Sequence, residues 1–271
     1  SGTSYKLRST SSETEATSAF LNNPYGIQRQ NVNSIQFVDS GFGFFTDKYV
    51  RWDVSAEGDG SVLAEARTDN VSGIYNIYVK PISGSKIYAN EDSSYLFAYI
   101  GYSSSNYITE PIRIGSVLDT SKTTNMSHMF YYAGYATMTS LDFSNFANFT
   151  TSNVTDMSYM FQDTGFKAMT DLKLGSNFNT SNVTDMKYMF YFTGRNSLKT
   201  IELGSKFNTS NVTNMMSMFE GTGCASSNFN SFYLGDLFYI KSNTNMFAMF
   251  RSFGQAGITT LDLGPAFTMI S

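Results

Sequence analysis

Residues 178–190 read FNTSNVTDMKYMF, and the same text recurs on both sides of them at intervals of about 30 residues. Each copy closes with the box Met-x-x-Met-Phe, and the Tyr-Leu-Phe at residues 95–97 matches the end of this box once more. The closing residues of the complete boxes are Phe130, Phe161, Phe190, Phe219 and Phe250. A fixed period of this size indicates a solenoid, in which each repeat forms one coil.

The apolar residues of the box predict a short helix. Val183, Met186 and Phe190 are spaced by three and four residues, which places them on one helix face that must be buried. Asn182 precedes the first apolar residue and Asp185 follows it, a pattern that predicts an N-cap. A glycine stands four residues after each closing phenylalanine, which predicts a left-handed residue at the helix end.

The second half of each repeat predicts a short strand. Residues 169–174 and 198–203 spell apolar-x-x-apolar-x-apolar, and the alternation at the end is typical of a strand. A glycine turn follows at Gly175 and Gly204. Each coil is therefore predicted as strand, turn, short helix and turn, and the chain as an α/β repeat solenoid.

The repeat text resembles a known family. The pattern L-x-x-L-x-L with a following apolar residue is similar to a leucine-rich repeat. The text T-S-N-V-T-[DN]-M-x-x-M-F resembles the BspA-like family of bacterial surface proteins, which carry DUF285-type repeats. This resemblance covers residues 90–271, and it implies leucine-rich-repeat-like coils on a protein that is exposed at the cell surface and serves in adhesion. Proteins that share such a scaffold differ in what they bind.

Three regions are expected along the chain. Residues 1–33 are rich in Ser, Thr, Asn and Glu, which predicts a flexible or edge-lying leader. Residues 34–90 hold short alternating runs between Gly and Asp turns, which predicts a β-rich N-terminal cap over the first coil. Residues 91–271 are predicted to form a repeat solenoid of about six coils that is truncated at the C-terminus.

Composition excludes several functions. A formal net charge of −4 and a pI near 5.0 provide no basic field, which argues against nucleic acid as a partner. No apolar run approaches the roughly 18 residues of a membrane span, so membrane insertion is not expected. A lone cysteine, Cys224, excludes an internal disulfide and a cysteine-based zinc site. We therefore expect no metal and no cofactor.

No assembled catalytic site is apparent either. His128 is the only histidine; it occupies a variable position of its box, so we expect it alone on a helix surface, without the partners that a general base needs. Asp142 and Glu202 lie on predicted strands two rungs, or roughly 10 Å, apart. That separation exceeds the ~5.5 Å of a glycosidase nucleophile and acid pair. We therefore expect no catalytic residue and no enzyme.

Two sets of residues are candidates for partner binding, because they vary between coils whose cores are fixed by packing. The first set lies on the solvent side of the predicted strands: Arg113, Asp142, Lys173, Glu202 and Tyr233. Alternating charges along this set also have a structural interpretation, since opposite charges on adjacent strands stabilise a sheet. The second set lies on or after the boxes, on the convex side: Tyr131, Tyr132, Tyr159 and Tyr188. Tyrosines give contact area at low entropic cost.

These observations favour a non-enzymatic binding module, extracellular or at the bacterial cell surface, that presents one solenoid face to a host protein, an extracellular-matrix component or a glycan. The alternative is a structural spacer or assembly segment of a larger surface protein; a glycan-active enzyme is a third. A contiguous, non-repetitive polar and aromatic patch would favour binding, whereas uniform faces would favour the spacer. The oligomeric state is left open.

Overall fold

The computed structural model describes residues 3–44, 49–68, 73–105 and 107–270. Its regular structure is almost entirely β. The helical segments in these ranges are three 3-10 turns, η1 (Phe20–Asn22), η2 (Arg29–Asn31) and η3 (Phe143–Asn145), and the described chain contains no α-helix. No helix there is long and apolar enough to cross a membrane. Residues 1–2 and 271, the ends of the predicted leader and of the predicted repeat region, lie outside the described residues.

The predicted α/β solenoid of short strand plus short helix is wrong, because the Met-x-x-Met-Phe boxes form consecutive turns. The amide of Phe190 donates to the carbonyl of Met218 in the next repeat over 2.8 Å, whereas an α-helix would bond it to the residue four positions back. Tyr188 has a φ of 57°, outside the helical region. A spacing of three and four residues buries the same side chains in a chain of turns as in a helix.

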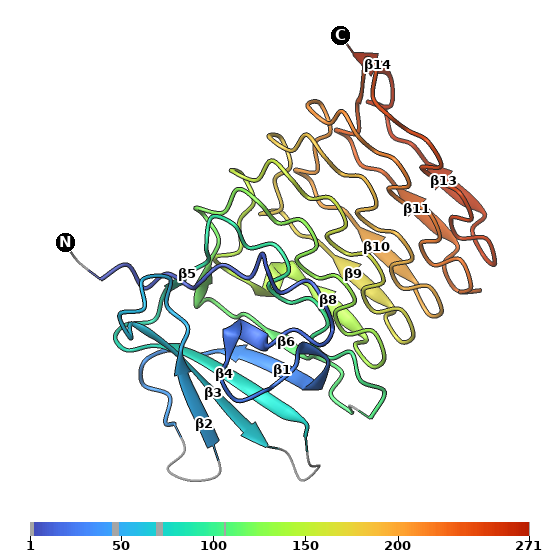
Figure 1. Cartoon of the computed structure of the whole chain (residues 1–271). Helices are drawn as coiled ribbons and strands as arrows, with labels where there is room; N and C mark the ends of the chain where they lie inside the picture. The colour runs from blue at the N-terminus through green and yellow to red at the C-terminus, as the bar shows by residue number, and fades with distance from the viewer. Residues whose placement is uncertain (1–2, 45–48, 69–72, 106, 271) are drawn as a thin grey trace.

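A five-stranded mixed sheet forms the N-terminal part of the molecule (Figure 1). Its spatial order is β2 (Tyr49–Asp53), β3 (Val62–Thr68), β4 (Tyr75–Pro81), β1 (Val32–Phe37) and β6 (Ile112–Arg113). The pairs β2–β3 and β3–β4 are antiparallel, whereas β1 runs parallel to both β4 and β6. Strand β6 therefore ties the first repeat to this sheet. The predicted divisions at residues 33 and 90 remain predictions.

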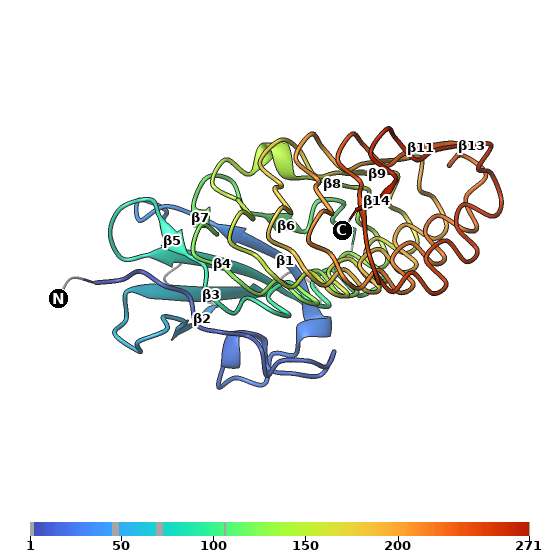
Figure 2. The same ribbon diagram turned by 90° about the horizontal axis from the view of Figure 1, so that it is seen from above.

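The following repeats lie side by side and continue from this sheet to the C-terminus (Figures 1 and 2). Strands β8 (Ser140–Asp142), β9 (Asp171–Lys173) and β10 (Thr200–Glu202) form a parallel three-stranded sheet. Strands β11 (Ser231–Tyr233) and β13 (Thr260–Asp262) form a parallel pair. Two more parallel pairs are β5 (Ile87–Tyr88) with β7 (Leu118–Asp119), and β12 (Ile240–Lys241) with β14 (Met269–Ile270).

A row of single β-bridges joins the boxes of successive repeats. Its members are Asp92, Asn125, Asp156, Asp185, Asn214 and Asn245. Asp185 Oδ1 accepts the amide of Lys187 at 3.0 Å and so closes a turn. Asn182 Nδ2 donates to the carbonyl of Ser152 in the preceding repeat at 2.7 Å. The predicted N-cap is thus wrong: Asn182 links two repeats, and Asp185 holds a turn in shape.

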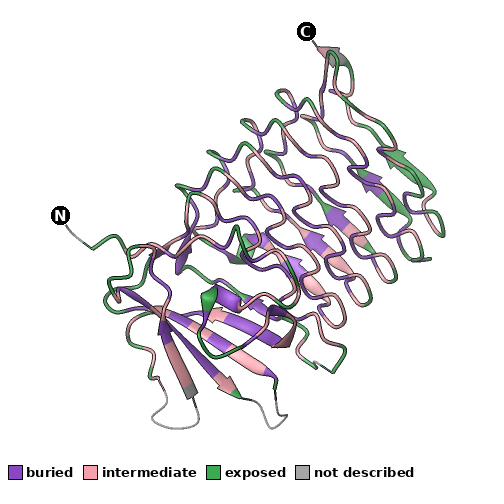
Figure 3. Cartoon of the chain, in the orientation of Figure 1, coloured by how far each residue is buried: buried purple, intermediate pink, exposed green. Residues whose placement is uncertain are grey.

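The interior is a continuous stack of phenylalanine rings. Phe97, Phe130, Phe161, Phe190, Phe219 and Phe250 follow one another at centroid distances between 5.2 and 5.5 Å. The box methionines pack around them, and Met186 and Met189 are fully buried. In Figure 3, the ribbon coloured by burial shows buried residues recurring from one repeat to the next. Each of the four inner rings buries apolar area against two neighbours in the stack, so the core is shared between repeats.

The glycine that follows each phenylalanine has the predicted left-handed φ, although no helix ends there. Gly134 has a φ of 56°. A Cβ at this position would lie 2.3 Å from the Cβ of Met138, closer than any ordinary contact. The glycine is therefore required both by its backbone conformation and by the close approach of Met138.

The first repeat is closed by the N-terminal segment. In the boxes, carbonyls accept hydrogen bonds from the repeat before, and the first box has no such repeat. Arg29 Nη1 instead donates to the carbonyls of Leu96 and Ala98 at 3.2 and 2.9 Å, and Thr10 Oγ1 donates to that of Ser94 at 2.7 Å. Buried Glu13 pairs with buried Arg29 at 3.2 Å. These side chains supply the donors that a preceding repeat would supply.

We expect Phe190→Ala to lower the free energy of unfolding by about 3–5 kcal/mol, because it removes one ring from the stack and leaves a cavity. Lys187→Ala serves as the control. Its ion pair with Asp185 is partly exposed at 3.3 Å, so its loss costs less than ~1 kcal/mol. Denaturant titration of both variants measures the difference, and equal unfolding midpoints would contradict the assigned core.

Arg29→Ala is expected to destabilise the fold by about 3–5 kcal/mol, since it leaves the Glu13 carboxylate buried without its partner. The carbonyls of Leu96 and Ala98 also lose their donor. Thermal unfolding provides the measurement, with Lys6→Ala as the control because Lys6 forms a more exposed pair with Glu91 at 3.1 Å. A melting temperature of Arg29→Ala no lower than that of Lys6→Ala would refute this closing role.

Candidate functional site

The strand-face candidates divide between three sheets. Asp142, Lys173 and Glu202 lie in register on β8, β9 and β10, so the structure brings these three together. Arg113 lies on β6, where it pairs in register with Gln36 of β1. Tyr233 lies on β11, and its hydroxyl donates to the Asp236 carboxylate.

The strand row is therefore interrupted twice. No pairing joins β6 to β8 or β10 to β11 among the described residues. A hollow of about 220 Å³ lies at the first interruption and one of about 250 Å³ at the second. Arg113 and Asp142 line the first, whereas Glu202 and Tyr233 line the second.

On the box side, a set of aromatic side chains forms a contiguous, half-buried surface that we call the aromatic face. Its members are Tyr95, Tyr99, Tyr102, His128, Tyr131, Tyr132, Tyr135, Tyr159, Phe166, Tyr188, Tyr191 and Phe192. Each ring contacts at least one other of the set. All four tyrosines predicted from the sequence belong to it.

The rings of the aromatic face form ladders along the stack of repeats. His128 lies between Tyr95 and Tyr159, at 4.5 Å from each, with planes within 11° of parallel. Tyr188 continues the row at 4.9 Å from Tyr159. Neighbouring rings cover both faces of His128 and of Tyr159, so their edges are what they present to solvent. The surface is consequently rigid.

The backbone at these positions is unusual. Tyr95, His128, Tyr159 and Tyr188 have φ between 57° and 65°, a left-handed conformation that costs roughly 1–2 kcal/mol for a residue with a Cβ. The equivalent places in the last two repeats hold Ser217 and Ala248, with φ of 52° and 56°. The turn therefore does not require an aromatic side chain. The last two repeats keep the same turn but have no aromatic side chain at this position, so the row of rings stops before them.

Asp163 lies buried among these rings, in the position that Tyr132 occupies one repeat earlier. Burial raises the pKa of its carboxyl to about 6, and interactions with the side chains of Gln162 and Tyr132 oppose this shift only in part. The carboxyl therefore changes its charge close to neutral pH. A charge that forms here lies beneath the aromatic face.

His128 is also perturbed. Its Nδ1 is buried and makes no hydrogen bond within the part of the chain that the structure describes. Burial lowers the pKa of the imidazole to about 4, and the charge of Asp156 opposes this shift. The expectation that His128 stands alone on a helix surface is wrong, since it lies between two tyrosine rings. A neutral, stacked imidazole acts here as one more ring of the ladder.

Sequence reasoning missed part of the aromatic face. Tyr95 lies in the incomplete first box, and Tyr99 and Tyr102 follow it; their ring contacts with the second repeat extend the surface by one repeat. The signal was available, because Tyr95, His128 and Tyr159 hold the same place in successive repeats. In the described ranges, no group of three His, Cys, Asp or Glu side chains is arranged to hold a metal ion.

The family described as "Mycoplasma protein of unknown function, DUF285" matches residues 102–198 and 134–261. These overlapping matches span more than half of the 271 residues, and the chain belongs to this family. No curated protein and no solved structure matches it.

Buried Asp163 and half-buried His128 predict opposite pH dependences of stability. In the folded chain, the Asp163 carboxyl has a pKa of about 6, above its ordinary 3.8. Its contribution to the free energy of unfolding is therefore full below pH ~4. Roughly 3 kcal/mol of this stability is lost as the pH rises through ~6. His128 has a folded pKa of about 4, below its ordinary 6.5. Its contribution is present above pH ~6.5 and is lost as the pH falls through ~4, by roughly 1–2 kcal/mol after solvent screening.

Asp163→Asn is therefore expected to remove the loss of stability toward neutral pH. His128→Tyr, which continues the tyrosine ladder, is expected to remove the loss of stability toward acid pH. Urea unfolding of the wild type and both variants between pH about 4 and 7 measures these slopes. Parallel pH profiles for all three proteins would contradict the assignment.

Proposed function

We propose that this chain is a non-enzymatic binding module, acting outside the bacterial cell, that holds a protein partner such as a host protein or an extracellular-matrix component on its aromatic face. The observation that carries the proposal is the restriction of the aromatic rows to the earlier repeats. Ser217 and Ala248 show that the same turns form with small side chains. A spacer would have no need of rings at selected repeats.

The rigidity of the aromatic face suits a protein partner. Tyrosine is enriched at protein interfaces because it offers a large, partly apolar area at little cost in side-chain entropy. Rings already stacked on their neighbours lose even less freedom when a partner binds. The aromatic face is thus preorganised for binding.

The same stacking disfavours a glycan on this surface. A sugar packs its apolar C–H face against an open aromatic ring face, and His128 and Tyr159 have both ring faces covered. Ring edges and tyrosine hydroxyls suit the mixed polar and apolar surface of a protein better. We therefore propose a host protein or an extracellular-matrix component, rather than a glycan, as the partner of the aromatic face.

Location outside the cell is supported by the resemblance of the T-S-N-V-T-[DN]-M-x-x-M-F text to BspA-like surface proteins. A net charge of −4 is compatible with a partner that is not strongly acidic. The strand face is the competing surface, because Asp142, Lys173 and Glu202 present charges in register there.

The double variant Tyr159→Ser, Tyr188→Ser tests the proposal, since serine already occupies the equivalent position at Ser217. Purified matrix and host-cell surface proteins, immobilised as an array, are the probes. We expect the wild type to bind at least one of them, and the double variant to lose at least about tenfold in affinity, as for a removed hot spot. Circular dichroism checks that both proteins are folded.

The double variant Lys173→Ala, Glu202→Ala is the matched control on the strand face, and its affinity is expected to stay within about twofold of wild type. Loss of binding in this control alone would transfer the site to the strand face. Absence of any protein bound by the wild type would support the spacer.

A further inference from the structure

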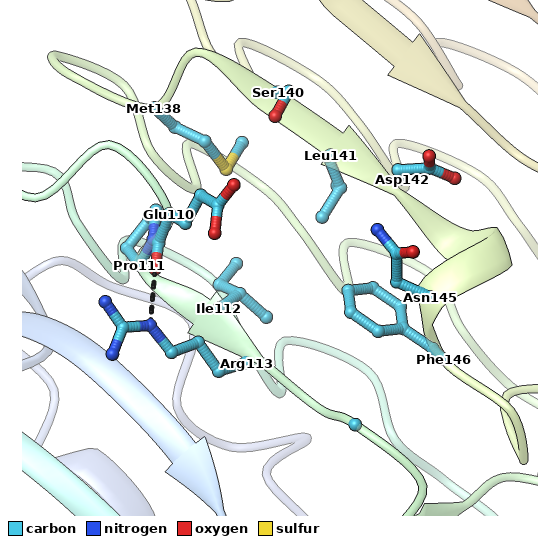
Figure 4. A pocket seen from close by; sticks show the side chains of 11 residues that line it. Glu110, Pro111, Ile112, Arg113, Met138, Ser140, Leu141, Asp142, Asn145 and Phe146 are labelled. Atoms are coloured by element: carbon cyan, nitrogen blue, oxygen red, sulfur yellow. Dashed lines mark hydrogen bonds between the residues drawn. The ribbon is translucent and has the colours of Figure 1, made fainter.

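The hollow between β6 and β8 is a formed cavity on the strand side of the molecule, apart from the aromatic face. Its volume is about 220 Å³, larger than the ~150 Å³ that accommodates one benzene molecule. A compact ligand of about a dozen non-hydrogen atoms fits such a space. We call it the β6–β8 hollow (Figure 4).

The hollow lies where two neighbouring strands belong to different sheets, and it adjoins a hollow of about 250 Å³ between the paired strands β8 and β9, with which it shares Asp142 and Asn145. Strand β6 pairs with β1, whereas β8 pairs with β9. The repeats remain joined before the strands, where Thr139 N donates to the carbonyl of Thr109 at 3.1 Å, and again after them, where Asn148 Nδ2 donates to that of Ser116 at 2.6 Å. The opening is therefore local, and each side is held by its own sheet.

The floor of the hollow is apolar. Ile112, Leu141 and Phe146 line it and are only 5, 3 and 7 % exposed. Met138, which is almost fully buried, closes one end. Water in contact with such a floor is readily displaced by an apolar ligand surface.

The rim is polar on both sides. In Figure 4, Glu110 and Arg113 lie on one side of the floor, and Asp142 and Asn145 lie on the other. Arg113 Nε donates to the carbonyl of Glu110 at 3.1 Å, which fixes the side chain and leaves its terminal nitrogens without an acceptor in the described chain. Asp142 Oδ1 accepts from the amide and hydroxyl of Ser144 at 3.0 and 2.6 Å, which leaves Oδ2 for a ligand.

The other two rim groups are equally available. Across the described residues, the Glu110 carboxylate and the Asn145 amide make no hydrogen bond and no ion pair, and both residues are exposed. The rim thus combines acceptors on Glu110 and Asp142 with donors on Arg113, while Asn145 offers both. Two carboxylates against one guanidinium disfavour an anionic ligand.

We infer that the β6–β8 hollow binds one neutral pyranose residue of a glycan. A pyranose has about a dozen non-hydrogen atoms, an apolar C–H face for the floor, and hydroxyl groups that both donate and accept. Those hydroxyls match a rim of planar side chains with both capacities. A purely apolar side chain would leave these rim groups unpaired, and it would bury them at a cost.

The second interruption, between β10 and β11, provides an internal comparison. Its hollow has a similar volume, about 250 Å³, and is lined by Glu202 and Tyr233. There the Tyr233 hydroxyl already donates to the Asp236 carboxylate, so both groups are engaged with each other. The β6–β8 hollow is distinguished by the guanidinium of Arg113 and the side-chain amide of Asn145, because the lining of the second hollow holds neither kind of group.

Titration of the isotope-labelled chain with methyl glycosides of neutral hexoses and N-acetylhexosamines tests the inference, with chemical shifts as the readout. We expect saturable shifts at Leu141 and Phe146 for at least one of these sugars, with a dissociation constant in the millimolar range expected for so small a ligand. Arg113→Ala, Asn145→Ala, at two exposed positions, is expected to weaken binding at least about tenfold.

Two controls separate this site from others. Glu202→Ala alters the second hollow, and Tyr159→Ser, Tyr188→Ser alters the aromatic face; both are expected to keep the sugar affinity within about twofold. The inference is overturned if no sugar of the panel gives saturable shifts. It is equally overturned if Glu202→Ala abolishes binding while the Arg113, Asn145 variant retains it.

Discussion

The backbone hydrogen bond between one repeat and the next is the interaction on which this structure depends. The amide of the closing phenylalanine donates to a methionine carbonyl one repeat later, at 2.8 or 2.9 Å, in the four boxes that end at Phe130, Phe161, Phe190 and Phe219. A turn in the box satisfies only part of its own backbone, so no repeat is complete alone. Stacked phenylalanines add apolar burial in the same direction. Hydrogen bonding and packing therefore act between the same neighbours, and both require the regular spacing that the sequence repeats.

This dependence explains which parts of the fold could be predicted. Local patterns in the sequence predict the spacing of the repeats and the burial of Met186 and Phe190. They also predict the short strands at residues 171–173 and 200–202. They do not predict the hydrogen-bond partner of the Phe190 amide. The spacing of apolar residues shows which side chains are buried, but it does not show which carbonyl accepts from the amide. Tyr188 adds a second reason, since its left-handed φ is one that few tyrosines adopt. A helix and a series of turns would bury the same side chains, and they differ in their backbone hydrogen bonds.

The candidate sites were open to prediction to a different degree. A tyrosine that recurs at one place in the repeat, such as Tyr159 followed by Tyr188, can be found from the sequence. The separation of Arg113 from Asp142 cannot, because it arises from the pairing of β6 with β1, two segments far apart in the chain. Long-range pairing changes two expected neighbours into opposite walls of a hollow. The repeat pattern of the sequence therefore does not show where strand pairing is interrupted.

The closing role of Arg29 has a consequence for how copies of this chain can meet. A stack of identical repeats is in principle open to addition at both ends, and unpaired backbone is a template for association. At the first repeat, the carbonyls of Leu96 and Ala98 are already occupied by one guanidinium. A further repeat could be added here only by displacing the buried ion pair of Arg29 with Glu13. One side chain thus occupies the backbone groups through which this end of the stack would otherwise accept another repeat.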